Sequence, residues 1–192
     1  MILESIVTTN NEDGSVNVSP MGPSGENDLS TFELRPFDTS RTFVNLKRNR
    51  AGVLHITDDV GIFARSAIGK LDPLPPLQDA ERVSGKIISN ACRWHEFEVE
   101  FIDETGPRMN LNCKTVCSAR NRDLWGFNRG KHAVLEAAIL ATRLEFLPAE
   151  EIANQFICLQ TIVEKTGGIQ ERNAFALLSD HVGHEAGKAL RA

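Results

Sequence analysis

The hydrophobic pattern of this chain changes period near residue 127, and this change limits the possible folds more than any other feature. Residues 95–102 alternate apolar and polar side chains one by one, which is typical of strands with one buried face. Residues 131–146 instead repeat their apolar side chains with helical spacing. We therefore expect a β domain over residues 1–126 and a helical extension over residues 127–192, packed on the barrel or on a partner subunit.

The alternating runs before residue 127 number six or seven, and long crossings separate several of them. This predicts a small antiparallel split β-barrel rather than a parallel sheet, followed by three C-terminal helices. Within the run 95–102, Phe97, Val99 and Phe101 should be buried, whereas the glutamates 96, 98 and 100 should face water. His55 is expected to be a hydrogen-bonded core residue, and Asp58 with Asp59 to cap a short helix.

Composition excludes several classes of function. The formal charge of −5 and the pI near 5.6 argue against nucleic-acid binding as the main role. No apolar run is long enough to cross a bilayer and no leader pattern precedes the first strand, so we expect a cytoplasmic protein that does not bind membranes. Two basic clusters remain, and they indicate either an anionic ligand or solvated helix faces: 41–50, and Arg120, Arg122, Arg129 and Lys131.

The first hairpin offers a place for a polar ligand. Residues 11–14 supply a turn between two β-rich arms, and on the second arm Asn17 and Ser19 share one face. This arm breaks at Pro20 and Gly22, which exposes hydrogen-bonding groups at the end of a sheet.

A helix begins shortly afterwards and is suited to an anion. Residues 38–40 are candidate N-caps, and Arg41 follows in the first turn between Ser40 and Thr42. The unpaired N–H groups and the positive dipole of a helix start favour a phosphate there.

These residues carry a resemblance to a known class of proteins. The chain resembles the flavin-reductase-like split barrels, which are similar in fold to pyridoxamine phosphate oxidase, and most closely the family called domain of unknown function 447. The resemblance covers nearly the whole chain and rests on the motifs at 7–9, 17–23, 42–46, 57–59 and 127–138.

The resemblance implies FMN bound at the interface of a homodimer. It places the phosphate on Ser40, Arg41, Thr42 and Asn45. It also implies that the ribityl chain and the ring edge lie against the end of the first hairpin, at Asn17, Ser19, Pro20, Met21 and Gly22.

The start of the helical extension is the second candidate site. His132 and Glu136 lie four residues apart on one helical face, and their pairing predicts either a catalytic role or a surface ion pair. Arg129 or Lys131 would favour an anionic reduced flavin. No metal site is expected, because His181 and His184 lack a third ligand at suitable spacing.

Two functions are compatible with these observations. The first is an FMN-dependent oxidoreductase that uses a nicotinamide or a deazaflavin as its electron partner, since related split barrels use both. The second is a flavin or pterin-like binding module or carrier with a protein partner.

Overall fold

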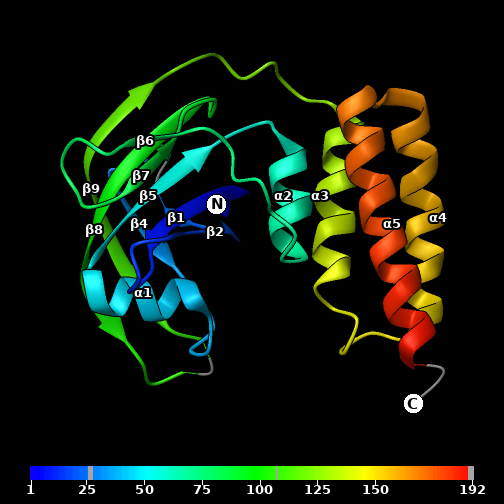
Figure 1. Ribbon diagram of the computed structural model, residues 1–192, viewed down its shortest axis with the longest axis horizontal. Helices are drawn as coiled ribbons and strands as arrows, with labels where there is room; N and C mark the ends of the chain where they lie inside the picture. Colours follow the sequence, from blue (N-terminus) through cyan, green and yellow to red (C-terminus); the bar gives the residue numbers. More distant parts are fainter. Residues whose placement is uncertain (26–27, 107, 190–192) are drawn as a thin grey trace. The chain divides into compact units, whose positions relative to one another are not determined.

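The computed structural model describes residues 1–25, 28–106 and 108–189, and the chain divides into two compact units. The first, here called the barrel unit, comprises Met1–Thr57 and Pro73–Leu124. The second, the helical unit, comprises Asp58–Asp72 and Trp125–Ala192. Each unit has its own hydrophobic core, and Figure 1 labels their elements.

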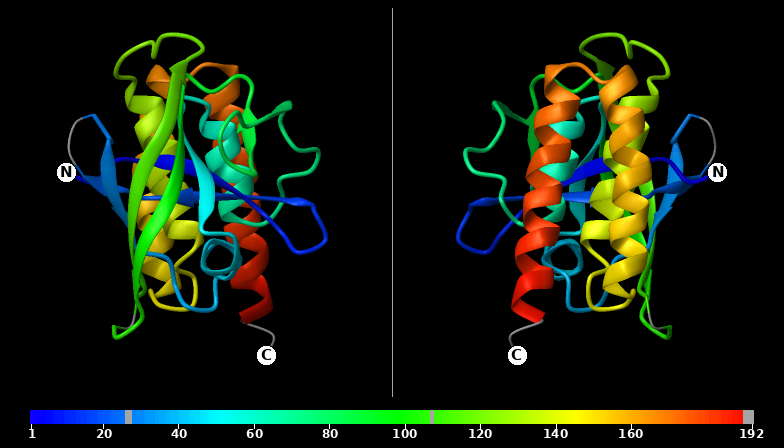
Figure 2. Two further views of the ribbon diagram at one scale, coloured as in Figure 1. Left: turned by 90° about the vertical axis from the view of Figure 1, so that its left-hand side faces the viewer. Right: turned by 90° about the vertical axis from the view of Figure 1, so that its right-hand side faces the viewer.

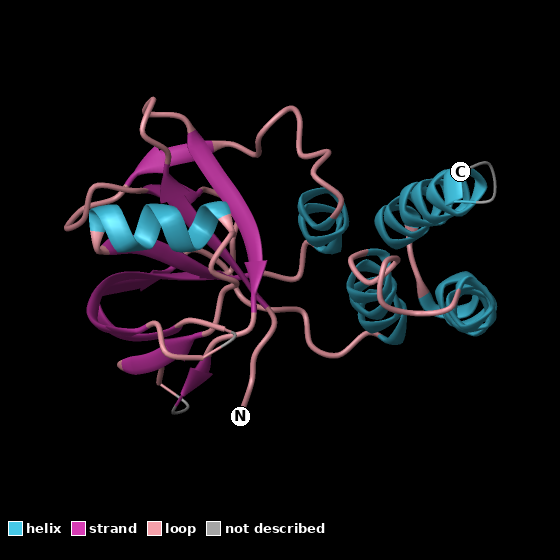
Figure 3. Ribbon diagram, turned by 90° about the horizontal axis from the view of Figure 1, so that it is seen from below, coloured by secondary structure: helices cyan, strands magenta, loops and turns pink. Residues whose placement is uncertain are grey.

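The barrel unit is built on a seven-stranded sheet in which all pairs of neighbours are antiparallel. Its strand order is β2-β1-β5-β8-β9-β4-β3, and it curls into a half barrel (Figure 3). The predicted split-barrel fold is confirmed. The strands are β1 (Ser5–Asn10), β2 (Val16–Met21), β3 (Ser24–Gly25), β4 (Thr31–Leu34), β5 (Ala51–Ile56), β8 (Arg93–Asp103) and β9 (Asn110–Arg120).

Helix α1 (Arg41–Asn49) packs one face against the core of the barrel unit. Phe43 and Leu46 are buried there in one cluster with strand residues that include Val7, Leu54 and Phe97. Burial of apolar side chains of this size stabilises the fold by roughly 1.5–3 kcal/mol each. The helix ends at Arg50, which adopts a left-handed conformation with φ of 56°.

A small hairpin of β6 (Leu77–Asp79) and β7 (Lys86–Ile88) covers the other face of the sheet. Its Ile87 packs with Val53 and Trp94. Hydrogen bonds also hold the β6–β7 hairpin on the main sheet. The hydroxyl of Thr8 donates to the Lys86 carbonyl at 2.5 Å, and the Ile88 N–H donates to Nε2 of His55 at 3.0 Å.

His55 is fully buried, as expected, and both of its ring nitrogens have partners. Because Nε2 accepts from Ile88, the hydrogen lies on Nδ1, which is 3.1 Å from the Ile6 carbonyl. Burial lowers the pKa of His55 to about 4. The neutral ring on β5 therefore links β1 and β7 through its two hydrogen bonds.

Two expectations for β8 were wrong. Glu96 is buried instead of facing water, because its carboxylate accepts the backbone N–H groups of 81–83 at 2.6–2.9 Å. Phe101 is 59% exposed instead of buried. The pairing with β9 shifts between Val99 and Phe101, and this bulge moves Phe101 to the opposite face.

The helical unit contains α2 (Val60–Ala67), α3 (Arg129–Ala141), α4 (Ala149–Thr166) and α5 (Ile169–Ala189). The three predicted C-terminal helices are confirmed, and they run side by side (Figure 2). Helix α2 shares their core through Val60 and Ala64, and Asp59 caps it by accepting from the N–H groups of Gly61 and Ile62. Among the described residues, no helix combines the length and apolar character that a bilayer crossing needs.

The stability of this chain should fall as the pH drops from 6.5 toward 4. The pKa of His55 is about 4 in the folded chain and 6.5 in the unfolded chain, so only the unfolded chain gains a proton in this range. The stabilisation that comes from the neutral His55 ring is complete above pH 6.5. Acidification toward pH 4 removes it and lowers the free energy of unfolding by up to about 3 kcal/mol. Urea unfolding across this range should give a flatter profile for His55→Gln than for the wild type. Equal slopes would show that His55 is not the titrating group.

Replacing Glu96 by Gln should lower the free energy of unfolding by about 1–3 kcal/mol. The amide keeps the shape but loses one of the two oxygens that accept from the 81–83 backbone. Glu98→Gln is the matched control, because Glu98 is exposed on the same strand and its loss should change stability by less than about 0.5 kcal/mol. Equal unfolding midpoints for the two variants would rule out this anchoring role.

Candidate functional site

The start of α1 has the properties of an anion site. Ser40 is extended, and its Oγ accepts from the N–H of Phe43 at 3.1 Å, which makes it the N-cap. The first turn contains no acidic residue, and the side chain of Arg41 is exposed. The remaining N–H groups of the first turn and this guanidinium thus provide positive charge and hydrogen-bond donors at one point.

A buried polar cluster joins this helix start to the first hairpin. Nδ2 of Asn17 lies 3.1 Å from Oγ1 of Thr42 and 3.2 Å from Oγ1 of Thr9. Nδ2 of Asn45 donates to the same Thr9 hydroxyl at 3.0 Å and to Oδ1 of Asn11 at 2.8 Å. Asn17, Thr42 and Asn45, which the sequence assigns to one ligand, therefore lie together and hydrogen-bond within the protein.

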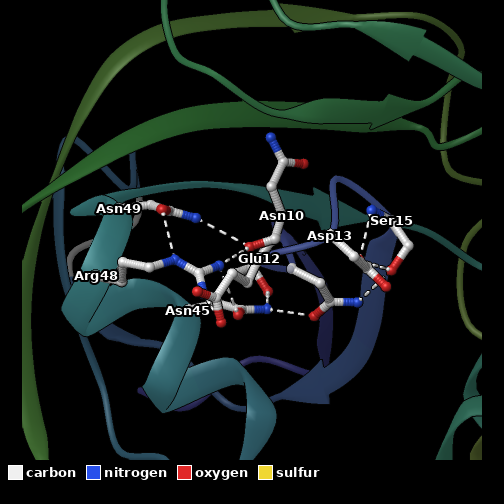
Figure 4. Close-up of polar contacts among 9 residues, drawn as sticks. Asn10, Glu12, Asp13, Ser15, Asn45, Arg48 and Asn49 are labelled. Carbon is white, nitrogen blue, oxygen red and sulfur yellow. Dashed lines mark hydrogen bonds and ion pairs between the residues drawn. The ribbon is translucent and has the colours of Figure 1, made fainter.

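The hairpin turn is held against α1 by a second set of contacts, drawn in Figure 4. The guanidinium of Arg48 donates to the Asn10 carbonyl at 2.9 Å and to Oδ1 of Asn45 at 3.2 Å, and Nδ2 of Asn49 donates to the same carbonyl. Oδ1 of Asp13 accepts from the N–H and hydroxyl of Ser15 and so closes the turn. Hydrogen bonding by Ser15 lowers the pKa of Asp13.

This set of contacts does not follow from the sequence pattern. The pattern places Arg48 only in a basic cluster, and the turn residues only in the turn. The signal present in the sequence is the density of Asn at positions 10, 11, 45 and 49, because Asn supplies both a donor and an acceptor to backbone groups.

The end of β2 holds the other residues that the sequence assigns to the ligand. Ser19, Pro20 and Met21 are half-buried, and β1 holds this end because the hydroxyl of Ser5 donates to the Met21 carbonyl at 2.8 Å. Gly22 follows and is exposed, and a Cβ there would lie 3.1 Å from Cγ2 of Ile2. The predicted residues of 17–22 and 40–45 thus all lie in the barrel unit, and the contact between Asn17 and Thr42 joins the two groups.

The predicted residues 129–136 lie in the helical unit, and the motif that contains them has structural roles there. Asn128 caps α3 by accepting from the Lys131 N–H at 3.0 Å, and it donates to the Thr166 carbonyl. Nζ of Lys131 is 2.8 Å from Oε1 of Glu171 and 2.8 Å from the Asp58 carbonyl oxygen. The ammonium of Lys131 therefore links α3 to α5 and to the start of α2.

Glu171 is the buried partner in this contact. Burial alone would raise its pKa, but hydrogen bonds from Lys131 and from the Gly168 N–H outweigh burial and hold the pKa below its ordinary value. Arg129, His132 and Glu136 are exposed on α3, and the ring of His132 contacts that of Phe127 edge-on. The roles assigned to these three residues stay predictions.

The curled antiparallel sheet, with a capped helix on its core, gives this protein the fold of the split barrels. The chain belongs to the family described as protein of unknown function DUF447, whose N-terminal model matches residues 3–122 and whose second model matches residues 128–180. No curated protein matches the chain.

Solved structures share the fold. An FMN-bound protein of the DUF447 family from Methanosarcina mazei is 24% identical with a TM-score of 0.81, and the match covers 94% of both chains. Flavoredoxin from Methanosarcina acetivorans is 12% identical over 62% of this chain and 68% of its own, with a TM-score of 0.53. An FMN-binding protein from Thermus thermophilus is 15% identical over 62% of this chain and 70% of its own, with a TM-score of 0.52.

Replacing Gly130 by Ala should destabilise the helical unit by about 1–3 kcal/mol, although Ala is the better helix former. A Cβ at this position would lie 2.8 Å from the Cα of Gly167, which is backbone and cannot rotate away. Gly183→Ala is the matched control. Gly183 lies in α5 with nothing within 4 Å of a new Cβ, so this change should stabilise by up to about 1 kcal/mol. Thermal unfolding of the two variants should shift in opposite directions, and a shift in the same direction would contradict close packing at Gly130.

Proposed function

We propose that this protein binds FMN, with the flavin phosphate at the start of α1 and the rest of the cofactor along the end of β2. The observation that carries the proposal is the 3.1 Å contact between Asn17 and Thr42, because it brings the start of β2 and the start of α1 into one place. The FMN found in the Methanosarcina mazei relative supports the same cofactor. A dianionic phosphate matches a helix start that has no acidic residue in its first turn.

The residues divide between holding the site and binding the ligand. Thr42 and Asn45 are 2% exposed and are hydrogen-bonded to the hairpin, so we assign them to the positioning of α1. Arg41 and the backbone N–H groups of the first turn would hold the phosphate, with Ser40 fixing the turn as its cap. The ribityl chain and ring edge would lie against Asn17, Ser19, Pro20, Met21 and Gly22.

Bound FMN would supply hydride or electron transfer, so this chain needs no nucleophile of its own. The chain would seat the cofactor and exclude water from its ring. We propose a reductase or oxidase that exchanges electrons with a nicotinamide or a deazaflavin. We also propose a homodimer with the flavin at its interface, which sedimentation of the FMN-loaded chain would test.

Arg41→Ala should weaken FMN binding by about 10- to 100-fold. Hydrogen bonds to a charged group contribute about 1.5–3 kcal/mol, and Arg41 is the exposed cation of the first turn. Arg50→Ala is the matched control, because it removes the same charge at the opposite end of the same helix. Quenching of flavin fluorescence gives both affinities. Full affinity in Arg41→Ala would overturn the phosphate assignment.

Turnover separates an oxidoreductase from a carrier. The FMN-loaded chain would be mixed with NADH, NADPH or a reduced deazaflavin, and the flavin absorbance followed without oxygen. Reduction followed by reoxidation on adding an acceptor supports the oxidoreductase. Tight FMN that none of these donors reduces favours a binding module.

A further inference from the structure

One face of the sheet in the barrel unit connects the proposed flavin site to a group of basic residues. Directly paired residues in antiparallel strands point to the same face, and the registers give a continuous row across five strands. This row starts at Ser19 on β2 and ends at His95 and Ser118 on β8 and β9, and it consists of Ser19, Val7, Leu54, His95 and Ser118. Val7 and Leu54 belong to the barrel core, so the row lies on the inner face.

The next row on this face ends in two arginines. Arg93 lies two residues before His95 on β8, hence on the same face, and its direct partner on β9 is Arg120. Both side chains are exposed. Like charges that face each other across a ladder are destabilising unless a counter-charge lies between them. Asp123 partly compensates, with its carboxylate 2.9 Å from Nη1 of Arg120, but no ion pair of Arg93 occurs among the described residues.

His95 provides an independent sign of a missing partner. The residue is 3% exposed, and its Nδ1 has no hydrogen-bond partner in the part of the chain that the structure describes. A buried polar atom without a partner costs about 1–3 kcal/mol, so such atoms are rare and each is a candidate for a contact with a bound ligand, ion or water. Burial lowers the pKa of His95, the charge of Arg93 lowers it further, and Asp28 acts in the opposite direction.

The acidic groups near these residues already have partners. Asp28 accepts from the Ser30 N–H at 2.9 Å, and Asp123 pairs with Arg120. The guanidinium of Arg93 and the unpaired imidazole nitrogen of His95 therefore share a face without an ion pair in the described part of the chain, and Arg120 on the same face shares its charge there with Asp123 alone. Arginine pairs with planar oxyanions through two parallel hydrogen bonds, and neutral imidazole protonated at Nδ1 adds a third donor.

We propose that Arg93, His95 and Arg120 bind an oxyanion, a carboxylate or a phosphate, of the small molecule that exchanges electrons with the flavin. The spacing suits one such group, since residues two apart on a strand lie about 6.8 Å apart and directly opposite residues about 5 Å apart. Ser118, opposite His95 and exposed, adds a hydroxyl to the site. The electron-transfer part of this inference rests on the proposed function; the oxyanion site does not.

The site is tested first on the flavin-free full chain. Succinate and inorganic phosphate are the two probes, at ionic strength kept constant with sodium chloride, and the imidazole signals of His95 are followed by NMR. At least one probe should shift these signals saturably. Arg93→Gln and Arg120→Gln should weaken that binding by at least 10-fold, whereas Arg82→Gln, an exposed arginine elsewhere in the barrel unit, should leave it unchanged. The probe that binds more tightly identifies the carboxylate or the phosphate.

A stability measurement distinguishes a binding role from a structural one. If Arg93 serves an absent anion, Arg93→Gln should leave the thermal midpoint of the flavin-free chain unchanged or higher at low salt, because it removes a like-charge contact. A lower midpoint would assign Arg93 to the fold and overturn the inference. The oxyanion site is likewise ruled out if neither probe shifts the His95 signals, or if all three variants bind as the wild type does.

The FMN-loaded chain tests the link to the flavin. Saturating probe should then perturb the flavin absorbance in the wild type and not in Arg93→Gln. Bound FMN without any response to the probes overturns this inference and leaves the proposed function standing. A chain that binds the probe but fails to bind FMN overturns the proposed function, and with it the assignment of the oxyanion to an electron partner.

Discussion

The hydroxyl of Thr9 is the group on which the candidate site depends. It is buried, and its oxygen accepts from both Asn17 on β2 and Asn45 on α1. Each of these amides would cost about 1–3 kcal/mol if it were buried without a partner. Neither β2 nor α1 can shift relative to β1 without losing one of these bonds, so α1 and the start of β2 are fixed before any ligand arrives. Such preorganisation reduces the ordering that a ligand must impose on its site.

Polar side chains also determine where the segment 79–88 lies. Thr8, His55 and Glu96 come from three neighbouring strands, and each forms a hydrogen bond with the backbone of this segment. The hairpin 77–88 that contains it forms only three residue pairs of sheet, which is too little to fix its position. Its attachment therefore comes from the main sheet. A carboxylate and a neutral imidazole are retained inside because each has its backbone partners, which lowers the cost of burying them.

Much of the fold follows from local pattern. The change of period near residue 127, the turn at 11–14 and the caps at Ser40 and Asp59 are each decided by a few neighbouring residues, and the structure has them where the sequence predicts. Glu96 and Phe101 could not be predicted in this way. The burial of Glu96 depends on the backbone of 81–83, which lies outside its own strand, and the exposure of Phe101 depends on a bulge in its pairing with β9.

The candidate site, like the fold, could be predicted from the sequence only in part. Residue type identified Asn17, Thr42 and Asn45, but not that Asn17 bonds to Thr42 or that Asn17 and Asn45 share the hydroxyl of Thr9. In the motif 127–138, Asn128 and Lys131 hold helices together, although their types suit a phosphate equally well. A family motif therefore mixes residues that bind a ligand with residues that build its surroundings. The hydrogen-bond partners in the fold separate the two kinds.

This distinction shows where specificity should be sought in a protein whose proposed chemistry belongs to its cofactor. A side chain whose polar atoms are already hydrogen-bonded inside the fold has less left to offer a ligand, and this applies to Thr42 as an acceptor and to Asn45 and Lys131 as donors. A flavin needs few protein groups to react, so the choice of its partner must come from donors that the fold has left unused. In the described part of the barrel unit, such donors include the guanidinium of Arg41 at the start of α1, and Arg93 with the unpaired nitrogen of His95 on the inner face of β8. The first group matches the phosphate of a cofactor, and the second matches an anion of the molecule that reacts with it.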